Sequence, residues 1–281
     1  MTDLSAFSTE KPLILAGCGN MGGALLDGWL KSGLSRDAVM IVDPVMTEAG
    51  TAPAGIACVA QVGDLPDCAP AMVMLAVKPQ IMETVAAGYI DWVKASGAAV
   101  ISIAAGVGMA SYEAWFGAET PLIRVMPNTP AAVGAGMSLL LKNDAVSDEL
   151  AKLSEIMLHT VGESIWVATE DQIDALVGVT GSGPAYVFLL IECIAAAAQK
   201  TGLSAEQAKL AARQTVFGAA LLADQQPDVD PAELRRRVTS PGGVTQAALD
   251  VLMAEGRGLP DLFPEAMEAG ERRNAELSGK T

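Results

Sequence analysis

A short apolar run that ends in glycines is the feature that most constrains the fold of this chain. Residues 13–16 form an apolar run that is typical of a buried parallel strand. The next residues follow the pattern Gly17-x-Gly19-x-x-Gly22, after which apolar residues recur at helical spacing. A glycine turn between a strand and a helix is the setting in which backbone N–H groups bind the pyrophosphate of a dinucleotide. A plain tight turn would give the same pattern, because the chain has 28 glycines.

An acidic residue at the end of the next strand supports a dinucleotide site. Val39–Val42 is a second β-rich run, and Asp43 follows it, 21 residues after Gly22. At that distance a carboxylate can accept hydrogen bonds from the ribose hydroxyls of adenosine. Asp43 would also repel a 2′-phosphate, and no Lys or Arg follows it before Lys78. The sequence therefore favours NADH over NADPH, although Asp43 can also be read as a turn residue before Pro44.

Strands and helices alternate through the first half of the chain. Apolar runs at residues 71–77, 98–103 and 122–126 are typical of buried strands. This alternation predicts right-handed crossovers and an α/β fold with a doubly wound parallel sheet. Ligands bind such sheets beyond the carboxyl ends of the strands, so the glycine turn, Asp43 and the ends of the later strands are expected to converge on one crevice.

The pattern changes near residue 168, which predicts a second domain. A helix predicted over residues 147–158 lies between two late strands, and turn signals follow at Ala168. Beyond that point the pattern is helical throughout. We therefore expect a dinucleotide-binding domain over residues 1–168 and an all-α domain over residues 169–281.

An apolar stretch in the second domain raises the question of a membrane span. Residues 176–198 carry one charged side chain, Glu192. Gly181–Pro184 interrupts the stretch with a helix start, and no basic or aromatic anchors flank both ends. We therefore predict no membrane partner, but a helix buried against other helices or a second subunit.

The composition argues against several classes of function. The 281 residues include 33 acidic and 18 basic side chains, a net charge of −15, which disfavours nucleic acid as a partner. One histidine, His159, and four cysteines without a C-x-x-C pair argue against a zinc site and a Ser-His-Asp triad, so no metal is predicted. The first ten residues do not resemble a signal peptide, so we expect reduced cysteines and a cytoplasmic location.

A second candidate anion site lies between two predicted helices of the second domain, at residues 239–245. This loop offers hydroxyl groups at Ser240 and Thr245. Gly242 and Gly243 leave its backbone flexible, and a new helix begins there, whose first N–H groups suit a carboxylate. An ordinary helix–helix turn with a proline stop is the alternative interpretation.

Six segments of the chain, in this order, resemble the pyrroline-5-carboxylate reductase family. They are residues 17–22, 76–79, 102–107, 126–130, 181–186 and 240–245. The last two are the most specific, because other dinucleotide enzymes lack them. The resemblance implies reduction of 1-pyrroline-5-carboxylate to L-proline, the last step of proline biosynthesis, with NADH or NADPH. It also implies an N-terminal Rossmann domain and a helical domain that forms an interlocked homodimer. Such dimers often form a ring, and the resemblance allows a decamer of dimers.

The resemblance also implies site residues. Together with Gly22 and Asp43 of the nucleotide motif, the cofactor contacts would be Ala16, Gly17, Cys18, Gly19, Asn20, Met21, Ala76, Val77, Lys78, Pro79, Ala104, Ala105 and Gly106. The substrate carboxylate would be bound by Ser240, Gly242, Gly243, Val244 and Thr245. Thr245 is the predicted catalytic residue, which hydrogen-bonds the ring nitrogen and relays a proton. Glu170 matches a family position near the substrate amine.

Two positions depart from the family pattern. Many members carry Ser, Thr or Asn near Asp43 and favour NADPH, which leaves the coenzyme preference open. Arg237 replaces a smaller polar residue that is common in relatives, and this change could narrow the pocket.

Two other functions fit part of the pattern. A reductase of another cyclic imine or of a β-hydroxyacid would share the two-domain plan. The hydroxyacid enzymes use a catalytic lysine in a helix of the second domain, and Lys200 and Lys209 lie in no motif of that kind. A non-catalytic dimeric nucleotide sensor would not need a second anion site. Oxidation of NADH in the presence of 1-pyrroline-5-carboxylate distinguishes these functions.

Overall fold

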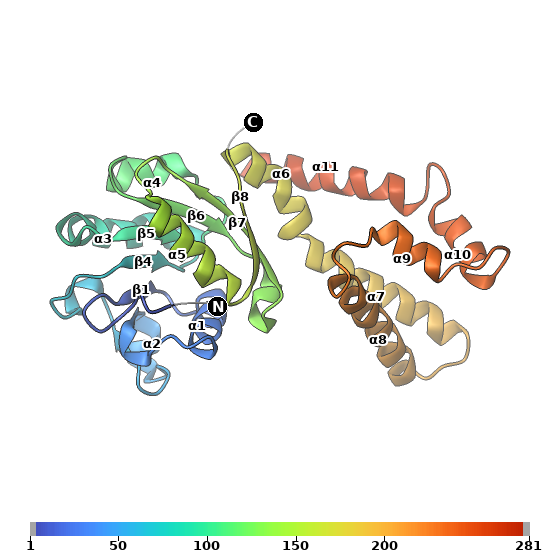
Figure 1. Cartoon of the computed structure of the whole chain (residues 1–281), viewed down its shortest axis with the longest axis horizontal. Coiled ribbons are helices and arrows are strands. Elements are labelled where there is room, and N and C mark those ends of the chain that lie inside the picture. Colours follow the sequence, from blue (N-terminus) through green and yellow to red (C-terminus); the bar gives the residue numbers. More distant parts are fainter. Residues whose placement is uncertain (1–3, 278–281) are drawn as a thin grey trace. The chain divides into compact units, whose positions relative to one another are not determined.

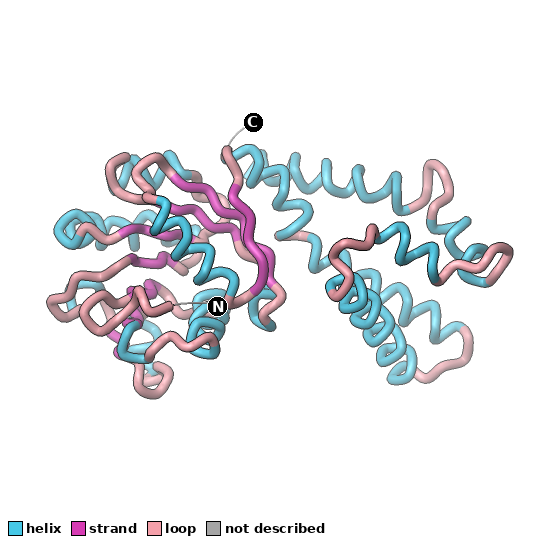
Figure 2. Tube along the Cα trace, viewed as in Figure 1, coloured by secondary structure: helices cyan, strands magenta, loops and turns pink. Residues whose placement is uncertain are grey.

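The chain folds into two units (Figure 1). The computed structural model describes residues 4–277. The first unit runs to Gly181 and includes the end of the last helix, from Asn274, whereas the second is Ser182–Arg273. Figure 2 shows the strands gathered in the first unit and the second unit built from helices alone.

The first unit contains an eight-stranded sheet in the order β3-β2-β1-β4-β5-β6-β7-β8. The strands are β1 Leu13–Ala16, β2 Val39–Val42, β3 Ala57–Val59, β4 Met72–Leu75, β5 Ala99–Ser102, β6 Leu122–Met126, β7 Gly136–Lys142 and β8 Gly162–Trp166. Strands β1 to β6 are parallel, and the strand order reverses between β1 and β4. This is the doubly wound fold predicted from the alternating pattern.

Strand β7 departs from the predicted parallel sheet. It pairs antiparallel with β6, and β8 runs parallel to β7. The cause is the short connection from β6, which is a 3-10 turn over Thr129–Val133. A connection of this length returns the chain beside the strand it has just left, whereas a parallel neighbour needs a long crossover.

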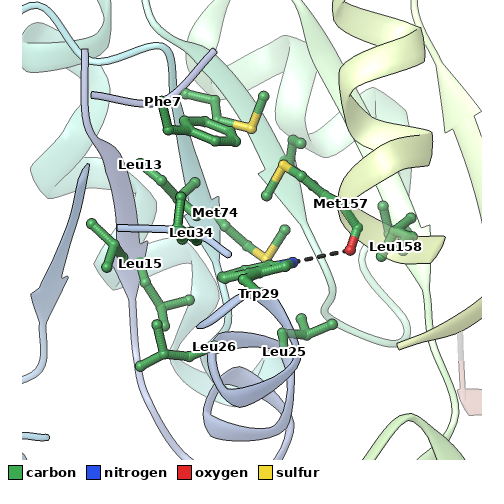
Figure 3. Packing of buried hydrophobic residues seen from close by; sticks show 14 of the residues in the cluster. Phe7, Leu13, Leu15, Leu25, Leu26, Trp29, Leu34, Met74, Met157 and Leu158 are labelled. Carbon is green, nitrogen blue, oxygen red and sulfur yellow. Dashed lines mark hydrogen bonds between the residues drawn. The ribbon is translucent and has the colours of Figure 1, made fainter. Parts of the chain in front are cut away.

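Helices cover both faces of the sheet. They are α1 Asn20–Lys31, α2 Pro44–Ala49, α3 Met82–Ser96, α4 Met109–Phe116, α5 Asp148–His159 and α6 Glu170–Thr180. One apolar cluster packs α1 and α5 against one face, and a second packs α3, α4 and α6 against the other. Figure 3 shows the first cluster around Trp29, which is fully buried and donates from Nε1 to the carbonyl oxygen of Met157 at 3.0 Å.

The second unit is built from α7 Gly183–Lys200, α8 Ala205–Asp224, α9 Pro231–Arg237, α10 Val244–Leu252 and most of α11 Leu259–Leu277. A capping box of Ser204 and Gln207 begins α8, as the sequence predicts. Helices α7 and α8 pack through small side chains, of which Ala195, Ala208 and Ala212 are buried. Several large apolar side chains of both helices are exposed, among them Phe188, Leu189, Leu210 and Phe217, whereas Ile191 and Ile194 are partly buried against the alanines.

Helix α6 belongs to the first unit, although the sequence pattern placed a boundary before it, at residues 168–169. Ile173 of α6 is fully buried in the second apolar cluster. At the other end of the helix, the Asn128 side chain donates from Nδ2 to the carbonyl oxygen of Thr180 at 2.8 Å. The proline-flanked loop that contains Asn128 therefore anchors the end of α6.

The apolar stretch noted in the sequence is long and apolar enough to cross a membrane by length and composition alone, over Glu170–Lys200. The structure divides it into α6 and α7, with a break at Gly181 and Ser182. One such stretch is weak support for a membrane span, because core helices of other proteins satisfy the same criteria.

Candidate active site

The carboxyl ends of four strands lie at one edge of the sheet. Ala16 of β1 is in register with Val42 of β2 and with Leu75 of β4. Leu75 is in turn in register with Ser102 of β5. The segments that follow these strands, which carry most of the predicted cofactor residues, are therefore neighbours at this edge, where doubly wound sheets bind ligands.

The glycine turn after β1 needs its glycines for steric reasons. Gly17 has φ +88°, and a Cβ there would lie 2.8 Å from the carbonyl oxygen of Ala76. A Cβ on Gly22 would lie 2.5 Å from the carbonyl oxygen of Gly17, so α1 can approach β1 only without a side chain. Gly19 is exposed, with open space where its side chain would be. The turn is thus tight at both ends and open in the middle.

The first turn of α1 offers free backbone donors toward this opening. Gly19 is the N-cap residue and supplies no side-chain bond. Within residues 4–277, Gly23 donates to the carbonyl oxygen of Gly19 at 2.7 Å, while the N–H groups of Asn20, Met21 and Gly22 have no backbone acceptor. Three free N–H groups at the positive end of a helix dipole suit a diphosphate, so the residues present fit a dinucleotide.

Asp43 lies at the end of β2, as predicted, and its carboxylate holds two backbone groups. Oδ2 accepts from Cys18 N at 2.9 Å, and Oδ1 accepts from Met46 N at 3.0 Å. The first bond ties Asp43 to the glycine turn, and the second caps helix α2. The adjacent Cys18 thiol is half-buried, and burial together with the Asp43 charge raises its pKa to about 11. Cys18 therefore remains a neutral thiol beside the turn.

The other predicted cofactor residues divide by exposure. Lys78 and Pro79 after β4 are exposed, as are Ala105 and Gly106 after β5. Ala104 is buried. Ala16 is also buried, and its carbonyl oxygen accepts from Ala76 N at 2.7 Å within the sheet. The side chains of Ala16 and Ala104 therefore pack inside the unit, and these two residues could contact the cofactor only through their backbone.

The predicted substrate loop of the second unit forms a tight turn before α10. Ser240 accepts at its carbonyl oxygen from Gly243 N at 3.0 Å, and Gly242 has φ +66°. Proline at the second position and a positive φ at the third are the features of a type II turn. Gly243 is the N-cap of α10 without a side-chain bond. Val244 is 90% exposed, and the Thr245 side chain is exposed in the first helical turn.

A hollow of about 400 Å³ opens beside this loop. It is lined by Arg235, Arg236, Thr239, Gln246, Leu249, Asp250 and Met253. The residues that line it do not include the predicted substrate-binding residues. Arg237 lies on the same helix as the two lining arginines, and it donates to Glu233 at 3.1 Å and to Gln226 at 3.2 Å. These bonds hold Arg237 against its own unit.

Glu170, at the start of α6, has two partners inside the first unit. Its Oε1 accepts from Met109 N at 2.6 Å, and its Oε2 pairs with the guanidinium of Arg124. Both carboxylate oxygens therefore have partners inside the first unit, and the predicted role of Glu170 near the substrate amine stays a prediction.

Arg124 is the residue that sequence reasoning missed. It is 4% exposed in the middle of β6. A signal was present, because a charged side chain inside the apolar run of residues 122–126 must find a partner if that run is a buried strand. The pattern could not show that the partner is Glu170, 46 residues along the chain.

Comparison with known proteins identifies the family of this chain. A model described as pyrroline-5-carboxylate reductase dimerisation matches residues 170–277, and a model described as NADP oxidoreductase, coenzyme F420-dependent, matches residues 13–106. The pyrroline-5-carboxylate reductase of Pseudomonas aeruginosa is 39% identical over 93% of this chain and 95% of its own length. The chain belongs to the pyrroline-5-carboxylate reductase family.

Two solved reductases of the family show the same fold. The structure from Coxiella burnetii has a TM-score of 0.88 at 33% identity and covers 95% of this chain and 98% of its own. The pyrroline carboxylate reductase of Plasmodium falciparum, solved with NADP bound, has a TM-score of 0.79 at 26% identity over 96% of this chain and 99% of its own. The α/β class and the helical second unit are confirmed as features of this reductase family.

Proposed function

We propose that this chain reduces 1-pyrroline-5-carboxylate to L-proline with a nicotinamide dinucleotide, as the last step of proline biosynthesis. The observation that carries the proposal is the match to the Pseudomonas aeruginosa reductase across nearly the full length of both proteins. A non-catalytic nucleotide sensor and a reductase of a β-hydroxyacid have no comparable support.

The first unit binds the coenzyme in this proposal. The pyrophosphate is held by the N–H groups at the start of α1, and Gly19 leaves room for its approach. The adenosine ribose lies at Asp43, at the end of β2. Because the sheet order continues from β1 to β4 and β5, the nicotinamide end reaches the segments after those strands, residues 76–79 and 104–106.

We infer a preference for NADH over NADPH from Asp43. Its carboxylate is fixed by Cys18 N and Met46 N, and a fixed negative charge there disfavours the 2′-phosphate of NADPH. The Plasmodium falciparum relative was solved with NADP bound, so NADPH is the coenzyme against which this preference is measured.

The loop before α10 binds the substrate carboxylate in this proposal. The hydroxyl of Ser240 and the backbone of Gly242, Gly243 and Val244 supply the donors, in a chain whose net charge of −15 offers little general attraction for an anion. Free N–H groups at the start of α10 stabilise a carboxylate without a cationic side chain.

The chemistry requires orientation more than strong acid catalysis. The substrate nitrogen can arrive protonated as an iminium, whose carbon is already electrophilic. A bound reduced nicotinamide supplies the hydride that this carbon accepts. The loop fixes the carboxylate, and the Thr245 hydroxyl accepts a hydrogen bond from the iminium N–H. After hydride transfer the ring nitrogen is a neutral amine, and it takes up a proton from solvent through this hydroxyl. A chain with one histidine can support this reaction.

We also infer that the active form is a homodimer made through the second unit. Phe188 and Leu189 of α7 and Phe217 of α8 are each 58–59% exposed, a pattern that a second copy of the chain would cover. The family model that matches residues 170–277 is described as pyrroline-5-carboxylate reductase dimerisation. Assembly into a ring such as a decamer, and a cytoplasmic location, are further parts of the proposal.

The test is oxidation of NADH by the purified chain with 1-pyrroline-5-carboxylate as the only acceptor, with L-proline measured as product. We expect one proline for each NADH consumed. A β-hydroxyacid with NAD⁺ and an unrelated cyclic imine with NADH serve as rival substrates. Faster turnover of either rival would overturn the assignment, and binding of NADH without turnover of any substrate would favour a nucleotide sensor.

A further inference from the structure

The turn between β5 and α4 is held at both of its ends but open in its middle. It runs from Ala104 to Gly108, and Gly106 has φ +75°. At its start, Ala104 N donates to the Ser102 hydroxyl at 3.3 Å. At its end, Met109 N donates to Glu170 at 2.6 Å. The exposed residues between these two bonds are those assigned above to the nicotinamide end of the coenzyme.

The bond at the end of the turn comes from a distant part of the chain. Glu170 is the first residue of α6, and Met109 is the first residue of α4. Gly108, the N-cap of α4, supplies no side-chain bond, so the Glu170 carboxylate takes the place of a local cap. A negative charge at this end of a helix also interacts favourably with the helix dipole.

Arg124 fixes the position of that carboxylate. Arg124 projects from β6 toward the face covered by α4 and α6, and its guanidinium pairs with the second oxygen of Glu170. Burial lowers the pKa of Arg124, and the nearby Asp174 opposes this shift. A guanidinium buried within a sheet has little freedom to move, so the position of Glu170 is set by the sheet itself.

We propose that Glu170 is a positioning residue, which holds the Ala104–Gly108 turn in the shape that receives the nicotinamide end of the coenzyme. The inference rests on the proposed function, because that function assigns the turn to the coenzyme. In this proposal Glu170 acts on the coenzyme through Met109 N.

The first test shortens the side chain. Glu170→Asp keeps a negative charge for the buried Arg124, so the fold is retained. The shorter side chain cannot reach both partners. It should keep the charged pair with Arg124 and lose the weaker bond to the neutral N–H of Met109. We expect the dissociation constant for NADH to rise ~10-fold, because a displaced binding group loses its contacts with the ligand. The constant for ADP-ribose, which lacks the nicotinamide, should stay within about twofold.

A second variant separates positioning from the stability of the buried pair. Arg124→Met combined with Glu170→Met removes both charges, so no buried charge is left without a partner. Its unfolding midpoint should match or exceed that of Glu170→Asp, while NADH binding stays weak because Met109 N still lacks its acceptor. Asp148→Asn is the matched control, since Asp148 is the first residue of α5 and its side chain is fully exposed.

Three results would overturn the inference. They are wild-type affinity for NADH in both variants, equal weakening of NADH and ADP-ribose, and an equal effect of Asp148→Asn. A failure of the proposed function would look different, because the wild-type chain itself would then fail to bind NADH or to reduce 1-pyrroline-5-carboxylate.

Discussion

The two units of this chain differ in where their apolar side chains lie. In the first unit, Trp29, Tyr112 and Phe116 are almost completely buried, and large aliphatic residues fill both faces of the sheet. In the described part of the second unit, the buried apolar residues are three alanines, whereas Leu210 is 70% exposed and Phe217 is 59% exposed. The first unit completes its core within one chain, and the second has apolar surface that needs a partner.

This difference matches the tasks proposed for the two units. A dinucleotide site needs a fixed edge of strands, which a filled core on both faces provides. The second unit carries the proposed substrate loop on helices whose packing a second copy would complete. Interpretation of any variant therefore depends on which unit it lies in.

The largest expected effect is loss of core packing in the first unit. Trp29→Ala removes a fully buried ring and its bond to Met157, and should lower the free energy of unfolding by about 3–5 kcal/mol. Urea unfolding measures this loss, which should not depend on protein concentration. The loss in Phe217→Ala should grow with protein concentration, because the exposed ring would be buried by the proposed dimer contact. A concentration-independent loss in both variants would break the comparison.

The next effect concerns association. Leu189→Asp places a charge on the exposed apolar face of α7 and should weaken dimerisation by about 2–4 kcal/mol. Sedimentation at several concentrations measures the dimer constant. Val45→Asp is the control, since Val45 is 74% exposed on the first unit. Equal effects of the two substitutions, or none from Leu189→Asp, would argue against a dimer contact on α7.

A smaller effect sharpens the role of the first unit. Asp43→Asn removes a negative charge but keeps an acceptor oxygen for Met46 N. The ratio of kcat/KM for NADPH to kcat/KM for NADH should rise by a factor that corresponds to about 1–2 kcal/mol. This is the size expected for removal of one half-exposed charge. Steady-state kinetics with both coenzymes gives the ratio. An unchanged ratio would mean that Asp43 does not face the ribose.

The smallest effect is a dependence of stability on pH. The folded state raises the pKa of Cys18 from 9.0 to about 11, chiefly by burial. The contribution of the neutral Cys18 thiol to the free energy of unfolding is therefore fully present below pH 9. It is lost as the pH rises through about 11. Between about pH 8 and pH 10.5, wild type should lose roughly 2 °C more in Tm than Cys18→Ala. Cys193→Ala, in the second unit, should behave like wild type, since Cys193 is exposed.

The sequence predicted the local features of the first unit well. Apolar runs located its strands to within one or two residues, because a buried strand needs continuous apolar side chains. The glycine turn was predictable because its steric demands fall on neighbouring residues.

Contacts between distant residues were not predictable. The pairing of Arg124 with Glu170 and the bond of Asn128 to Thr180 each join segments about 50 residues apart. Nothing in the helical pattern of α6 showed that it would pack with the sheet. The apolar pattern of α7 likewise could not show whether its cover comes from the same chain or from a second one.

The most direct test of the proposed division of tasks compares two substitutions. Gly17→Ala strains the coenzyme turn, and Thr245→Ala removes the hydroxyl proposed to bond the substrate nitrogen. NADH binding and kcat/KM for 1-pyrroline-5-carboxylate are measured for both. We predict that Gly17→Ala weakens NADH binding by about 1–3 kcal/mol. Thr245→Ala should lower kcat/KM by about 1–3 kcal/mol and leave NADH binding unchanged. Unchanged kcat/KM in Thr245→Ala, or equal loss of NADH binding in both variants, would contradict the account.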